Sequence, residues 1–168
     1  MNKKILIISI ITLLIDRITK ILASSFLKLN ISKKIIKSFF YLTLCHNTGA
    51  AWGIFSKYPF LLIIISFLAV VLIYHFSFSY KSSLRNNIAF GLLYGGLFGN
   101  LTDRIIYGYV IDFLDFIIIK YDYPVFNIAD IAIVIGVLLL VISTIKGDDS
   151  SGNSSKTRRR KTRQVSSS

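Results

Sequence analysis

The sequence predicts an all-α membrane protein with four transmembrane helices and a small extracytoplasmic β element. Of the 168 residues, 54% are hydrophobic and only 17% are charged, and the mean hydropathy is +0.65. A soluble domain carries about 25% charged residues. Four apolar stretches each approach the ~20 residues that a helix needs to cross ~30 Å of hydrocarbon. We expect these spans at residues 5–27, 58–80, 87–107 and 127–145.

The first apolar stretch begins like a secretory signal peptide, because Lys3 and Lys4 precede a run of apolar residues. Asp16, Arg17 and Lys20 follow where a small-residue cleavage site would lie. We therefore expect a retained span, in which Asp16 and Lys20 form an intrahelical pair at i, i+4 spacing.

The segment between the first two spans favours β structure. Residues 35–36 and 39–44 are rich in Ile, Phe, Tyr and Thr. We expect a small sheet on the membrane surface, with Trp52 and Tyr58 at headgroup depth. Residues 109–119 are also apolar but too short to span, so we expect an interfacial or re-entrant segment there.

The net charge of +12 reflects lysines and arginines that mostly flank the apolar stretches or lie in the tail. This distribution is typical of a membrane protein and does not predict a nucleic-acid partner. An even number of spans places both termini on one side, and the larger basic excess there favours the cytoplasm. The loop at residues 28–57 is also basic, against this rule. We expect a membrane domain at 1–146 and a disordered basic cytoplasmic tail at 147–168.

Two aspartates in this apolar setting are candidates for chemistry. Asp112 follows the third span, and Asp130 lies in the first turn of the fourth, after Pro124. The connection between them is long enough to bring the two carboxylates together. Such a pair shares a proton, so that one carboxyl activates water while the other protonates a carbonyl or leaving amine. The residues alone leave this interpretation level with a capping role, since Asp130 also gains from the helix dipole.

Other chemistries have less support. His46 and His75 are far apart in the chain without carboxylates at ligand spacing, so we predict no metal and no cofactor. Cys45 and His46 would point to opposite faces of a strand and do not form a dyad. We interpret Asp103 as a structural ion-pair partner of Arg104 and Lys20, and Asp115 as an exposed interfacial charge.

Five ordered motifs resemble those of the lipoprotein signal peptidase (signal peptidase II) family, which are intramembrane aspartic peptidases. The resemblance covers the chain from Asp16 to about Gly136, and residue 17 departs from it, being Arg where the family usually has Gln. The motifs are Asp16-x-x-Thr19-Lys20, Asn47-Thr48-Gly49-Ala50-Ala51-Trp52-Gly53, Gly99-Asn100-x-x-Asp103-Arg104, Gly108-x-Val110-x-Asp112-Phe113 and Phe126-Asn127-x-Ala129-Asp130.

This resemblance implies a bacterial inner-membrane enzyme that cleaves prolipoproteins before a diacylglyceryl-modified cysteine, at the outer face. It implies membrane lipids as further partners and Asp112 with Asp130 as the catalytic pair. Structural support would come from Asp16, Lys20 and Asp103. The implied substrate-binding residues are Asn47, Gly49, Asn100, Arg104 and Asn127.

Two rival functions remain on the residues alone. A small proton-coupled carrier would also use buried aspartates, although we find no repeat between the two halves of the chain. A non-catalytic assembly subunit would tolerate asparagine at either Asp112 or Asp130.

Overall fold

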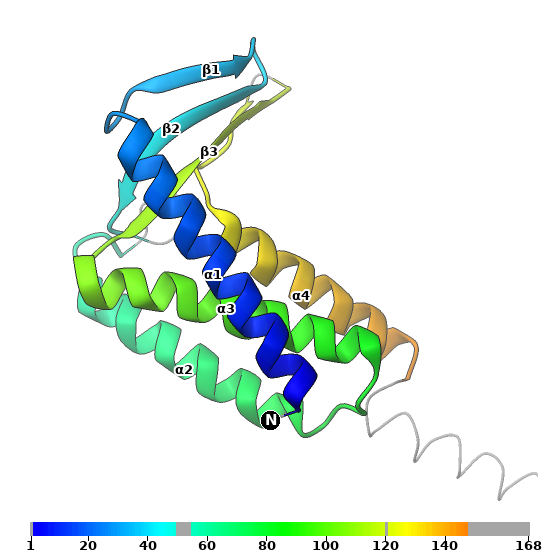
Figure 1. Ribbon diagram of the computed structural model, residues 1–168. Coiled ribbons are helices and arrows are strands. Elements are labelled where there is room, and N and C mark those ends of the chain that lie inside the picture. The colour runs from blue at the N-terminus through cyan, green and yellow to red at the C-terminus, as the bar shows by residue number, and fades with distance from the viewer. Residues whose placement is uncertain (1, 50–54, 120, 148–168) are drawn as a thin grey trace, which may run out of the picture.

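The computed structural model describes residues 2–49, 55–119 and 121–147, which form four helices and one four-stranded sheet. Figure 1 shows the helices side by side and the sheet at one end of them. The predicted anchor Trp52 and the predicted tail beyond Gly147 lie outside the described residues. The helices are α1 (Lys3–Phe26), α2 (Pro59–Ser77), α3 (Leu84–Tyr107) and α4 (Ile128–Ile145), and the strands are β1 (Ser32–Ile36), β2 (Phe40–Asn47), β3 (Val110–Ile118) and β4 (Tyr121–Asp122).

Helix α3 is the common wall of the molecule, since it packs against α1, α2 and α4. Small residues permit this close approach. A Cβ added to Gly99 would lie 2.5 Å from Oδ2 of Asp16 on α1, and one added to Gly96 would lie 2.5 Å from the carbonyl oxygen of Ala129 on α4. These glycines therefore hold the backbones of three helices near the end where the sheet lies.

Two of the four predicted spans meet a simple test of length and hydropathy. Within the described residues, Phe60–Ser77 of α2 and Ile128–Ile145 of α4 are long and apolar enough to cross a membrane. Helices α1 and α3 have 24 residues each, or about 36 Å. They fall short in hydropathy because they carry charged groups, several of which are buried inside the protein. The outer surfaces of these helices still expose large apolar side chains, such as Ile11 and Ile18.

The helix ends match local sequence signals. The side chain of Asn2 accepts a hydrogen bond from the backbone N–H of Lys4, and that of Ser83 accepts one from Asn86, so both residues cap their helices. Gly108 ends α3 with a φ of 77°, a left-handed conformation that suits glycine. This turn lets the chain leave α3 directly into β3.

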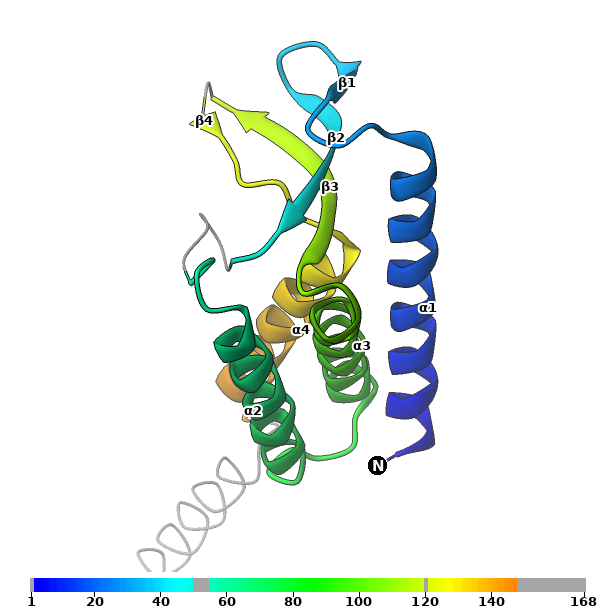
Figure 2. The ribbon, with the colours of Figure 1, turned by 90° about the vertical axis from the view of Figure 1, so that its left-hand side faces the viewer.

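The sheet is antiparallel with the order β1-β2-β3-β4, and it extends beyond one end of the helices (Figure 2). The β element predicted between the first two spans is confirmed. Residues 110–118, for which we expected an interfacial or re-entrant segment, instead form strand β3 and pair with β2. The reason is that β2 offers a free edge and β3 buries Ile111 and Phe113 beneath the sheet, against Ala23 of α1.

Candidate active site

Asp112 is held in strand β3, where it is almost fully buried with 2% of its surface exposed. Its backbone pairs with Cys45 of β2. The carboxylate accepts two amide hydrogen bonds: Nδ2 of Asn47 donates to Oδ2 at 2.9 Å, and Nδ2 of Asn127 donates to Oδ1 at 2.7 Å. Both partners are neutral, so they orient the carboxylate without balancing its charge.

Asp130 is positioned by the first turn of α4, as the sequence predicted. Asn127 caps this helix: its side chain accepts from the backbone N–H of Asp130 at 3.0 Å, while the carboxylate of Asp130 accepts from the backbone N–H of Asn127 at 3.1 Å. Nδ2 of Asn100 on α3 donates to the other carboxylate oxygen at 2.8 Å. The capping role and the proximity to Asp112 therefore coexist in one residue.

Asn127 connects the two aspartates. The side-chain amide of Asn127 is fully buried and donates to Asp112. The backbone N–H of Asn127 donates to the carboxylate of Asp130, and its Oδ1 accepts from the backbone N–H of Asp130. Nδ2 of Asn127 also lies 3.1 Å from Oδ1 of Asn100. The connection from β3 to α4 doubles back as expected, because the backbone of Phe126 pairs with Leu114. One amide side chain thus fixes the spacing between the two carboxylates, and we call Asp112 and Asp130 the aspartate pair.

The environment of Asp112 favours its protonated form. Burial, followed by the negative charge of Asp130, raises its pKa to about 7, against the opposing effect of the hydrogen bonds from Asn47 and Asn127 and the charge of Lys20. Near neutral pH the protonated form and the ionised form of this carboxyl are therefore both accessible. A carboxyl poised in this way can either give or take a proton during catalysis.

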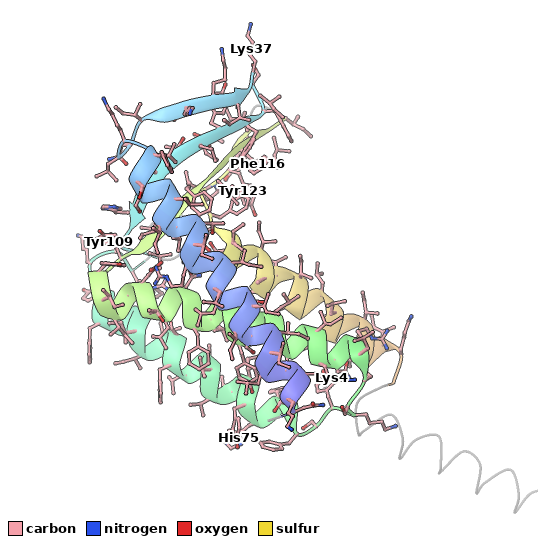
Figure 3. All side chains as sticks on the ribbon, in the orientation of Figure 1. Lys4, Lys37, His75, Tyr109, Phe116 and Tyr123 are labelled. Atoms are coloured by element: carbon pink, nitrogen blue, oxygen red, sulfur yellow. The ribbon has the colours of Figure 1, made fainter. Side chains whose placement is uncertain are left out.

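The aspartate pair opens onto a cavity of about 620 Å³. Polar groups gather at its end near the sheet, and apolar side chains of α4 form its opposite wall. Tyr123, which Figure 3 shows between the sheet and the start of α4, lies at its rim. The cavity is lined by Asn47, Ser66, Leu97, Asn100, Arg104, Val110, Asp112, Tyr123, Pro124, Val125, Phe126, Asp130, Ile131, Ile133, Val134 and Ile135.

Of the predicted substrate-binding residues, Asn47, Asn100 and Arg104 line this cavity. Gly49 borders it through its carbonyl oxygen, which accepts from Nη2 of Arg104 at 3.4 Å. The buried Nε of Arg104 has no hydrogen-bond partner within the described residues. Asn127 is fully buried behind the two carboxylates, where it positions them and is not part of the cavity wall.

The predicted supporting residues Asp16, Lys20 and Asp103 form a second group, together with the partly buried Arg17, and we call these four residues the ion-pair cluster. Nζ of Lys20 lies 2.8 Å from Oδ2 of Asp16, as the i, i+4 spacing predicted, and 2.8 Å from Oδ2 of Asp103. Asp103 also pairs with Arg17 at 2.5 Å. The prediction of Lys20 as its partner is confirmed, whereas the predicted partner Arg104 points toward the cavity and Arg17 takes its place.

The ion-pair cluster is linked to the aspartate pair. Nζ of Lys20 donates to Oδ1 of Asn100 at 3.0 Å, and Asn100 in turn donates to Asp130. Asp16 accepts from the backbone N–H of Ala129 at 3.0 Å, in the first turn of α4. The cluster therefore holds both Asn100 and the beginning of α4 in place.

The sequence interpretation of Asp115 was also wrong. Asp115, expected as an exposed charge, is buried at 9% exposure and accepts a hydrogen bond from the hydroxyl of Thr43 on the neighbouring strand. The expectation failed because β3 was not recognised as a strand, so its cross-strand partner was not sought. The β-branched and aromatic residues that fill 110–118 were the signal that could have revealed the strand.

The described residues offer no cluster of His, Cys, Asp or Glu suited to a metal ion. His46 stacks against Tyr109 with ring centroids 3.9 Å apart. Figure 3 shows Tyr109 beside the end of α3. Burial and the charges of Asp112 and Asp115 raise the pKa of the Cys45 thiol, which makes it a poor nucleophile. The chemistry available in this part of the molecule is that of the carboxyl groups.

Comparison with solved structures places the fold among bacterial membrane enzymes. Two of them, solved by the in meso method at 2.3 Å and 1.9 Å resolution, align with TM-scores of 0.76 and 0.74 at 35% identity. Both alignments cover 84% of this chain, with 87% of the first structure and 92% of the second.

The family model for signal peptidase (SPase) II matches residues 8–146. Lipoprotein signal peptidases of Staphylococcus aureus strains JH9 and Newman are 38% identical over 142 residues, which cover 84% of this chain and 87% of each relative. The chain belongs to the signal peptidase II family of aspartic peptidases. The resemblance found in the sequence is confirmed, and neither the carrier nor the assembly subunit gains support.

Proposed function

We propose that this protein is a lipoprotein signal peptidase that cleaves prolipoproteins before a diacylglyceryl-modified cysteine, using Asp112 and Asp130 as its catalytic pair. The observation that carries the proposal is the single cavity onto which both carboxylates open, with Asn127 fixing their spacing. A pKa of about 7 for Asp112 adds the shared proton that the chemistry needs.

In the proposed mechanism, the protonated carboxyl of the pair donates a hydrogen bond to the scissile carbonyl oxygen, and the ionised one takes a proton from water. The water then attacks the carbonyl carbon, and the proton on the first carboxyl neutralises the developing oxyanion. Collapse of the tetrahedral intermediate returns a proton to the leaving amine. Asn47 and Asn100 keep the two carboxylates oriented throughout, because each donates to one oxygen of the pair.

The cavity suits a lipid-modified substrate. Its α4 wall presents Ile131, Val134 and Ile135, which match acyl chains in polarity. Arg104 also lines the cavity, and its guanidinium can donate to a backbone carbonyl of the peptide. The scissile bond would then lie between a polar anchor and an apolar acyl site, beside the aspartate pair.

We also propose that all four helices span the membrane, with the termini in the cytoplasm and the aspartate pair near the outer face. Contacts at the end of the helices away from the sheet support this arrangement. Nδ2 of Asn2 donates to Ser82 at 3.0 Å, and Tyr80 pairs with Thr144 at 2.7 Å. The N-terminus, the loop between α2 and α3, and the end of α4 therefore share one side.

Incubation of the purified protein with a diacylglyceryl-modified prolipoprotein tests the proposal. The parent protein should release the shortened product, and Asp112→Asn and Asp130→Asn should each lower the rate by about 10²–10⁴-fold, the range that general acid–base steps contribute. Asp122→Asn is the matched control, because Asp122 is exposed on β4. Full cleavage by either active-site variant would refute the pair, and no cleavage by the parent would refute the peptidase.

A further inference from the structure

The basic loop between α1 and β2 has no role in the site just described. We define the basic hairpin as residues 28–39, which comprise the turn after α1, strand β1 and the turn into β2. Every residue in it is exposed. It contains four lysines (Lys28, Lys33, Lys34 and Lys37) and no acidic residue, and none of these lysines forms an ion pair within the described part of the chain.

The basic hairpin also exposes large apolar side chains. Ile31 and Ile36 are 58% and 51% exposed, and Phe39 is 46% exposed. Both faces of β1 are open, although one face of a strand is usually covered. On an edge strand, preventing the strand from pairing with other chains can be the whole function of the lysines. That role accounts for the charges, but it leaves the exposed isoleucines and the phenylalanine unexplained.

The position of the hairpin indicates what covers it. Helix α1 is about 36 Å long, which exceeds the ~30 Å of hydrocarbon, so its end at Phe26 reaches the headgroup layer. Strand β1 starts at Ser32, within about 20 Å of extended chain from that end. Figure 2 shows β1 and β2 just beyond the end of α1, and Figure 3 shows Lys37 at the tip, directed away from the helices.

We propose that the basic hairpin binds anionic phospholipid headgroups of the leaflet that the end of α1 reaches. The lysines bind the lipid phosphates, while Ile31, Ile36 and Phe39 enter the boundary between headgroups and acyl chains. Interleaved cations and apolar residues without a single acid are complementary to such a surface and to no part of the described protein. The proposal also explains why this loop is basic on the side where spans usually carry few positive charges.

Hydrogen–deuterium exchange of the full-length protein in nanodiscs tests this proposal. Nanodiscs of phosphatidylcholine alone are compared with nanodiscs that also contain phosphatidylglycerol. We expect residues 28–39 to exchange more slowly with phosphatidylglycerol, by about fivefold for each lysine that binds, and we expect high salt to remove the effect. The triple variant Lys33→Gln, Lys34→Gln, Lys37→Gln should lose this slowing.

The matched control removes three lysines at the opposite end, as Lys3→Gln, Lys4→Gln, Lys81→Gln, and should keep the slowing at residues 28–39. Retained prolipoprotein cleavage in phosphatidylcholine shows that each variant is folded. Equal exchange in the two lipids would overturn the proposal. The proposal would also be overturned if the slowing persisted in the hairpin variant, or if it appeared only after acidic prolipoprotein was added. It would be overturned too if self-association were the only property that changed in the hairpin variant.

Discussion

Two groups of buried carboxylates lie side by side at the same end of α3, and they differ in what surrounds them. In the ion-pair cluster, Asp16 and Asp103 face Lys20 and Arg17, so anions and cations balance. The aspartate pair instead faces the amides of Asn47, Asn100 and Asn127, and neither member forms an ion pair within the described residues. Amides supply hydrogen bonds without charge, and in the second group the pKa of Asp112 is raised to about 7.

The comparison shows that the charged groups that support the structure and the carboxylates proposed for catalysis have different surroundings. A balanced cluster is costly to disturb, because loss of one partner leaves a buried charge exposed to low dielectric. In the described part of the chain no cation forms an ion pair with the carboxylates of the aspartate pair, so the ionised form of Asp112 is disfavoured and its pKa is raised. Asn100 bonds both groups, so the stable cluster orients the reactive pair without neutralising it.

The largest effect on stability should follow from Asp103→Asn. Lys20 and Arg17 then lose a shared counterion in a buried site, and the free energy of unfolding should fall by about 3–5 kcal/mol. Thermal unfolding in detergent measures this loss. Prolipoprotein cleavage per folded molecule should remain within about tenfold of the parent, because Asn100 keeps its other partners. Abolished cleavage with unchanged stability would place Asp103 in the chemistry and contradict the comparison.

Asp112→Asn should have the opposite effect on stability. The folded pKa of Asp112, about 7, exceeds its ordinary value of 3.8, so the folded state loses stability as the pH rises from about 4 to 7. Asparagine removes this loss. We expect the variant to be more stable than the parent by the order of 4 kcal/mol at pH 8, with the difference absent at pH 4. Unfolding curves at the two pH values provide the measurement.

Asn47→Ala should change the pH dependence of cleavage. In the parent, activity should fall as the pH rises through about 7, because the pair loses its shared proton. Asn47 stabilises the ionised form of Asp112, so its removal should move this alkaline limb upward by about one pH unit. Thr43→Val is the control, since Thr43 lies on the same strand but bonds Asp115. An unmoved limb would show that another group governs it.

The smallest effect should come from Arg17→Gln. The side chain of Arg17 is 19% exposed, and Asp103 keeps Lys20 after the change. We expect a loss of about 1 kcal/mol in unfolding free energy, partly recovered by Arg17→Lys, and little change in cleavage. A loss as large as that of Asp103→Asn would show that Lys20 alone cannot balance the cluster.

The sequence predicted the helices and the first two strands, because these depend on local signals such as hydropathy, caps and β propensity. Spacing allowed Asp112 and Asp130 to meet, but the family resemblance was needed to select Asp112 as the partner of Asp130. The sequence did not predict β3, since an apolar run next to a span reads as membrane until its partner strand is known. The choice of Arg17 over Arg104 for Asp103 also depends on how α1 packs against α3. Spacing along one helix favours Arg104 and carries no information on that packing.

The cap at Asn127 has a consequence for how the protein is made. The same side chain that starts α4 also holds Asp112, and Asp130 itself lies in that first turn. Synthesis runs from the N-terminus, so α4 is the last of the four helices to leave the ribosome. Until it is in place, Asp112 lacks both Asn127 and Asp130, and the cavity lacks a wall. If the aspartate pair is catalytic as proposed, the chain cannot cleave a substrate before α4 has packed against α3.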